Sequence, residues 1–141
     1  MTTTRSVSVA QNQFKVVNLP NDAFWDRVEA NDWEPETFQV IDRFLPAQGV
    51  FWDFGAYNGI LSLYAATTAR QVLAVEPDPS AIELLTANIA LNPKVGQKIA
   101  FEPKAVSTSR VQFTLYARYA YGNSTSSLME RATDQLNSYQ C

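Results

Sequence analysis

Histidine is absent from the 141-residue sequence, and cysteine occurs only once, as Cys141. Without histidine the chain has no Ser-His-Asp triad, lacks most kinds of zinc site and has no imidazole to act as a general base. A single cysteine cannot form an internal disulfide. The sequence also has no apolar run of membrane-spanning length and no charged-then-apolar signal segment, so we expect no membrane partner and a cytoplasmic location.

Positive charge is scarce as well. Eleven Lys and Arg residues stand against fourteen Asp and Glu, which gives a net charge of −3 without any basic patch. We therefore expect that nucleic acid is not a partner. Apolar side chains make up 46% of the residues, which favours one globular domain with a single core. The polar residues 1–20 are expected to form a flexible leader, followed by an α/β domain at residues 21–141.

Strands and helices alternate along most of this domain. Apolar runs rich in β-branched and aromatic residues predict parallel strands at 48–54, 71–77 and 98–103. Helical spacing predicts helices at 21–31, at 35–46, from 58 onward and at 78–93, and a further strand is expected at 111–121. This order predicts a Rossmann-like doubly wound parallel sheet, of which the N-terminal half and a preceding helical segment are present. In such sheets the ligand lies at the carboxyl ends of the central strands.

The segment FWDFGAYNGILSLYAA, residues 51–66, has the pattern of a strand, a tight glycine turn and a helix start. Its turn reads D-x-G-x-x-x-G, from Asp53 through Gly55 to Gly59. This differs from the dinucleotide fingerprint, because Tyr57 stands where a glycine would admit the pyrophosphate. No lysine of a Walker loop follows either. An NAD-dependent dehydrogenase is therefore disfavoured.

The same turn suits S-adenosylmethionine, which has no phosphates and carries a methionine tail. We expect the bent backbone at Gly55 and Ala56, with the helix start near Asn58, to face the carboxylate of that tail. Asp53 is placed to face its ammonium group. Glu76 ends the next strand, at about the distance beyond the turn where an acidic residue meets a ribose.

Four segments of the sequence together resemble the FkbM family of methyltransferases. They are WEPETF (33–38), FWDFGAYNGILSLYAA (51–66), AVEPDPSAIELLTANIALNP (74–93) and KAVS (104–107). The similarity runs from about Trp25 to Leu128. The turn of this family commonly reads D-[VI]-G-A-N-x-G, and some members carry an aromatic residue where Tyr57 stands.

The resemblance implies a class I methyltransferase fold that binds S-adenosylmethionine and methylates a hydroxyl of a sugar or another small natural product. It places the cofactor against Asp53, Gly55, Ala56, Tyr57, Asn58, Gly59, Glu76, Pro77 and Ala105. Pro77 and the segment around Ala105 and Val106 would border the adenine.

Several of these features have structural explanations of their own. Asp53 could cap a strand end, and the glycines could serve the turn alone. Trp33, Glu34 and Thr37 could close over the methionine end of the cofactor, although packing and a helix start account for them too. The serine-rich stretch 124–127 is explained by a polar loop or by a substrate contact.

The sequence lacks the fourth strand with a D-x-E-G-like motif that the resemblance leads us to expect before Cys141. Without it, the strand that carries Asp53 would be an exposed apolar edge. No catalytic base is identified, since Glu102, Glu130 and Asp134 are candidates only as carboxylates. Two hypotheses follow. One is an O-methyltransferase completed by a homodimer or by another chain, and the other is a truncated, non-catalytic member that binds the cofactor weakly or not at all.

Overall fold

A three-stranded parallel sheet is the centre of the computed structural model, which describes residues 3–20, 23–109, 112, 114–116, 127 and 138–140. The sheet has the order β3-β4-β5, with β3 at Val50–Phe54, β4 at Gln71–Val75 and β5 at Ile99–Glu102. Its helices are α1 (Phe24–Glu29), α2 (Pro35–Phe44), α3 (Ile60–Ala65), α4 (Pro79–Leu91) and α5 (Pro93–Gly96). These elements confirm the predicted alternation of strands and helices.

Local sequence signals explain where the helices begin. Pro35 occupies the first turn of α2, where its missing N–H costs nothing. Asp78 caps α4, because its side chain accepts hydrogen bonds from the backbone N–H groups of Ser80 and Ala81. No helix among the described residues is long and apolar enough to cross a membrane.

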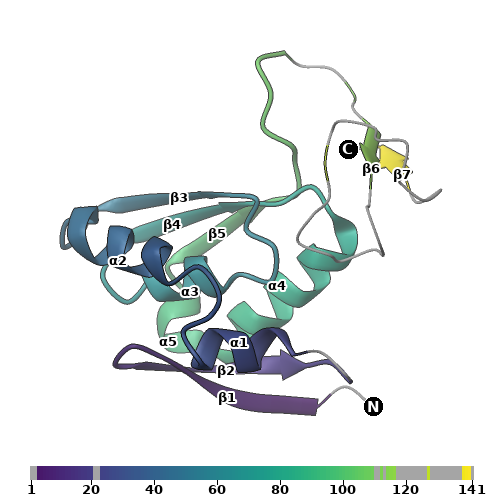
Figure 1. Cartoon of the computed structure of the whole chain (residues 1–141). Coiled ribbons are helices and arrows are strands. Elements are labelled where there is room, and N and C mark those ends of the chain that lie inside the picture. Colours follow the sequence, from purple (N-terminus) through teal and green to yellow (C-terminus); the bar gives the residue numbers. More distant parts are fainter. Residues whose placement is uncertain are drawn as a thin grey trace.

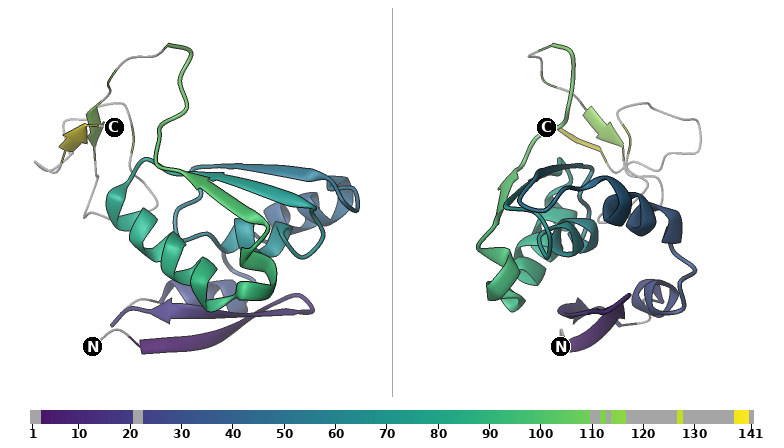
Figure 2. Two further views of the ribbon diagram at one scale, coloured as in Figure 1. Left: turned by 180° about the vertical axis from the view of Figure 1, so that it is seen from behind. Right: turned by 90° about the vertical axis from the view of Figure 1, so that its left-hand side faces the viewer.

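The helices that the structure describes lie on one side of the sheet (Figures 1 and 2). On that inner face Phe51, Val72 and Ile99, which are partners in the parallel register, pack into the main core. On the opposite face Trp52 and Phe54 of β3 are 59% and 56% exposed. Among the described strands β3 pairs only with β4, so the predicted exposed apolar edge is confirmed.

The expectation of a flexible leader over residues 1–20 is wrong for residues 3–18. They form an antiparallel hairpin of β1 (Thr3–Val9) and β2 (Asn12–Asn18), which lies beneath the helices in Figure 1. Alternate residues of both strands, Val7, Val9, Phe14 and Val16, are buried in the same core as α1, α2 and α3. The sequence signal for these two strands was the alternation of apolar and polar residues, although the polar residues lower the mean hydropathy of the segment.

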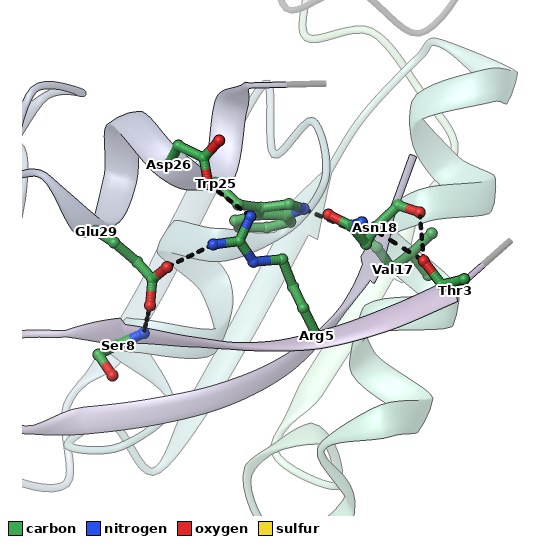
Figure 3. Close-up of polar contacts among 8 residues, drawn as sticks. All are labelled: Thr3, Arg5, Ser8, Val17, Asn18, Trp25, Asp26 and Glu29. Atoms are coloured by element: carbon green, nitrogen blue, oxygen red, sulfur yellow. Dashed lines mark hydrogen bonds and ion pairs between the residues drawn. The ribbon is translucent and has the colours of Figure 1, made fainter. Parts of the chain in front are cut away.

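Polar contacts fix the hairpin to α1, as Figure 3 shows. The indole Nε1–H of the buried Trp25 donates a hydrogen bond of 2.8 Å to the carbonyl of Val17. Arg5 of β1 bridges two carboxylates of α1, at 2.7 Å from Asp26 and 2.6 Å from Glu29. The hairpin and α1 therefore form one packed unit with the rest of the domain.

The strand predicted at 111–121 is described only in part. β6 (Thr114–Tyr116) pairs antiparallel with β7 (Ser138–Gln140), in a sheet separate from β3-β4-β5. Tyr116 also forms an isolated bridge with Ser127. Gln112 is described and is not part of a strand, whereas residues 111, 113 and 117–121 of the predicted strand lie outside the described residues.

Candidate functional site

A pocket of about 320 Å³ opens at the carboxyl ends of β3 and β4. Seven of the nine residues predicted from the sequence to bind a cofactor line it: Asp53, Gly55, Ala56, Tyr57, Asn58, Glu76 and Pro77. Ala105 lines a smaller adjacent pocket instead, which shares Gly55 and Pro77 with the first. Gly59 lines neither. The tertiary structure therefore brings most of the predicted residues together at the expected edge of the sheet.

The glycine turn that connects β3 to α3 has three residues with positive φ. These angles are +80° at Gly55, +51° at Tyr57 and +85° at Gly59. A Cβ atom added to Gly55 would meet no atom within 4 Å, so this glycine is required by its conformation and not by crowding. The mouth of the pocket is therefore open beside the backbone of Gly55.

Backbone hydrogen bonds of this turn correct one expectation. The N–H groups of Gly55 and Ala56, predicted to face a carboxylate, both donate to the carbonyl of Val75, at 2.8 and 3.1 Å. They fasten the turn across the end of β4, because each peptide N–H usually makes one strong hydrogen bond. Their assignment as anion donors is therefore not supported by the geometry.

Glu76 holds the other side of the turn. Its carboxylate is buried and accepts two backbone hydrogen bonds of 2.8 Å, from the N–H of Tyr57 and from the N–H of Asp78. Burial raises the pKa of Glu76 above its usual value, and the two hydrogen bonds act in the opposite direction. Each carboxylate oxygen has a second lone pair, so a hydroxyl group in the pocket can still donate to Glu76.

Asp53 lies on the inner face of β3 and is 5% exposed. The hydroxyl of Ser62 in α3 donates to its Oδ2 at 2.6 Å. Burial raises the pKa of Asp53, and the hydrogen bonds from Ser62 lower it in part. The negative charge of Glu34 adds to the increase, so these two carboxylates interact electrostatically.

The start of α2 forms another wall of the pocket. Trp33 and Glu34 both line it, whereas Thr37 does not. Trp33 also packs edge-to-face on Phe24, with ring centroids 4.9 Å apart, which agrees with the packing explanation for this residue.

Two residues beneath the pocket have roles that the sequence analysis missed. A Cβ on Gly59 would lie 2.5 Å from Cδ1 of Leu85, so this glycine lets α4 approach the turn. The fully buried Asn88 of α4 accepts a hydrogen bond from the N–H of Val17 and donates one to the carbonyl of Asn58. Asn88 follows Leu85 by three positions and so lies on the apolar side of the helix. A polar residue at such a position was the sequence signal for a buried hydrogen-bonding role.

The three candidate bases have different outcomes. Glu102 does not line the pocket, and its carboxylate pairs with Nζ of Lys104 at 2.7 Å. Glu130, Asp134 and the serine-rich stretch, apart from Ser127, lie outside the described residues. Within the described part of the chain, no group of three or more Asp, Glu or Cys side chains could hold a metal ion.

Comparisons with known proteins identify the fold. Neither a protein-family model nor a curated protein matches the sequence. Among solved structures, aTrm5 in complex with tRNALeu matches with a TM-score of 0.54 and 24% identity, over 77% of this chain and 30% of that chain. This match and the parallel sheet β3-β4-β5 confirm the predicted α/β fold with a parallel sheet.

Weaker matches point to other solved proteins. One is a SAM-dependent methyltransferase from Agrobacterium tumefaciens, with a TM-score of 0.49 and 18% identity over 72% of this chain and 32% of that chain. Another is Trm5 from Methanocaldococcus jannaschii in complex with adenosine, with a TM-score of 0.47 and 23% identity over 73% and 30%. This chain therefore spans about a third of the length of these three structures.

The exclusion of nucleic acid as a partner is contradicted by these comparisons. The matching protein aTrm5 was solved bound to tRNALeu. Net charge is a sum over the whole chain and does not describe any single surface, so a value of −3 does not exclude a nucleic-acid partner.

Proposed function

We propose that the pocket at the ends of β3 and β4 binds S-adenosylmethionine and that the domain serves methyl transfer. One observation carries this proposal: the buried carboxylate of Glu76 and the open side of Gly55 line the same pocket. A nucleoside needs an acceptor for its ribose hydroxyls and a backbone that it can approach closely. The resemblance to FkbM methyltransferases, which runs from about Trp25 to Leu128, agrees with this assignment.

Each end of the cofactor has a matching group in this arrangement. Glu76 would accept hydrogen bonds from the ribose hydroxyls, and Pro77 would border the adenine, with Ala105 in the adjacent pocket. The buried Asp53, which accepts a hydrogen bond from Ser62, would face the ammonium group of the methionine tail. When bound, the cofactor supplies an electrophilic methyl group. The residues that line the pocket would bind and orient the cofactor.

The acceptor has two candidates. The FkbM resemblance favours a hydroxyl of a sugar or another natural product. The fold match to aTrm5, which was solved with tRNALeu, makes RNA the second candidate. Incubating the chain with methyl-labelled cofactor and either RNA or saccharide would separate them, and label in neither would favour the non-catalytic hypothesis.

Calorimetric titration with S-adenosylhomocysteine tests the binding step. We expect a dissociation constant on the order of micromolar, with no heat from NAD. Glu76→Gln should weaken binding at least about tenfold, because a charge-assisted hydrogen bond to the ribose is lost. Glu83→Gln, an exposed site on α4, is the matched control.

A second variant is needed because Glu76 also holds the glycine turn. Gly55→Asn places a side chain at the open mouth of the pocket, and asparagine tolerates positive φ better than most residues. It should abolish binding while the thermal midpoint changes little. Wild-type affinity in Gly55→Asn would exclude this pocket as the cofactor site.

A further inference from the structure

Glu34 lines the pocket with a backbone conformation that is unusual for its residue type. It precedes α2 with φ +44° and ψ +47°, in the left-handed region. For a residue other than glycine this costs about 1–2 kcal/mol, so the surrounding structure must hold it there. The N–H of Thr37 donates to the carbonyl of Glu34 at 3.0 Å and helps to fix the first turn of α2.

Helix capping does not explain the carboxylate of Glu34. Its side chain makes no capping hydrogen bond to the backbone of α2, and Glu36 already places a negative charge in the first turn. The hydroxyl of Thr37 donates to Oε2 of Glu34 at 3.2 Å. This leaves Oε1 and further lone pairs of an exposed carboxylate available at the pocket wall.

The charges around the pocket are unbalanced. Three carboxylates line it, from Glu34, Asp53 and Glu76, and none of its described lining residues is a lysine or an arginine. Glu76 accepts two backbone hydrogen bonds, whereas Asp53 accepts only from Ser62 in the bonds that the structure gives it. Like charges that share a pocket repel each other, and a cationic ligand group removes this repulsion.

We infer that Glu34 is a specificity-determining residue, which together with Asp53 binds the α-ammonium group of the amino-acid end of the cofactor. This inference rests on the proposed function and names the part of the cofactor that α2 recognises. Asp53 would contribute a buried charge from the sheet, and Glu34 an exposed one from the start of α2. The helical segment before the sheet thereby takes part in cofactor selection.

Two ligands that differ only at the amino-acid end provide the test. S-adenosylhomocysteine carries the ammonium group, and 5′-methylthioadenosine has the same nucleoside without it. In calorimetry on the full chain, Glu34→Gln should lower the affinity for S-adenosylhomocysteine about fivefold to tenfold. Its affinity for 5′-methylthioadenosine should change less than about twofold. Glu34→Lys should weaken S-adenosylhomocysteine further. Glu36→Gln, an exposed site two residues along α2, should alter neither affinity.

Retained binding of 5′-methylthioadenosine also shows that each variant keeps a folded pocket. The inference is overturned if Glu34→Gln binds S-adenosylhomocysteine as the wild type does. It is equally overturned if Glu34→Gln lowers the affinity for both ligands by the same factor, because Glu34 would then act only on the fold. If the wild-type chain binds neither ligand, the proposed function fails as well, so the two failures are distinguishable.

Discussion

Replacing each of the two glycines of the β3–α3 turn by alanine separates backbone strain from side-chain crowding. Gly55 and Gly59 have nearly the same φ, +80° and +85°. Alanine at either position therefore has the same conformational cost, about 1–2 kcal/mol. Their surroundings differ, because a Cβ at Gly55 meets nothing within 4 Å, whereas a Cβ at Gly59 lies 2.5 Å from Cδ1 of Leu85.

That distance is about 1.0–1.5 Å shorter than the optimal carbon–carbon separation of roughly 3.5–4.0 Å. Leu85 is fully buried and packs with Ala56 and Ala74, so its side chain has little room to turn away. Overpacking of this kind costs about 1–3 kcal/mol. We therefore expect Gly59→Ala to lower the free energy of unfolding by about 1–3 kcal/mol more than Gly55→Ala does.

Urea unfolding followed by circular dichroism measures both values. A double-mutant cycle with Leu85→Ala isolates the contact, since this substitution removes Cδ1 at its own cost of about 2–5 kcal/mol. In the Leu85→Ala background, Gly59→Ala should cost no more than Gly55→Ala. The reasoning is refuted if the two single glycine variants are equally stable within about 0.5 kcal/mol, or if the cycle gives no coupling.

Three further predictions concern polar groups of buried residues. Asn88→Ala leaves a buried N–H and a buried carbonyl unpaired, and should lower the free energy of unfolding by about 2–4 kcal/mol in urea unfolding. Trp25→Phe removes the hydrogen bond to Val17 and should cost about 1 kcal/mol by the same assay; wild-type stability would contradict its contribution. Burial raises the pKa values of Asp53 and Glu76 above their usual values of 3.8 and 4.5, so these two carboxylates bind protons more tightly in the folded chain than in the unfolded chain. The stabilisation from these two carboxyl groups is complete below about pH 4 and is lost as the pH rises through their raised pKa values. Thermal midpoints measured against pH should therefore decline less with rising pH in the Asp53→Asn/Glu76→Gln variant than in the wild type.

Much of the fold was determined by short-range features of the sequence. These features are the apolar periods of two and 3.6 residues, the proline in the first turn of α2 and the aspartate that caps α4. Each of them depends only on residues a few positions away. The glycine turn followed the strand that carries Asp53, as predicted. Glu76 was placed at the end of the next strand, because successive parallel strands end at the same edge of a sheet.

Only the tertiary structure decided which groups face each other. Residues 3–18 look polar in sequence, yet their alternate apolar side chains are buried because α1 and α4 cover them. The N–H groups of Gly55 and Ala56 are used by Val75, and Gly59 is needed because Leu85 lies against it. The contacts of the turn with Val75 and Leu85 join residues 19 to 26 positions apart, and their pairing depends on how the layers pack. Periodicity and turn chemistry, which are local, therefore predicted the elements of the pocket, and long-range packing determined what each residue does there.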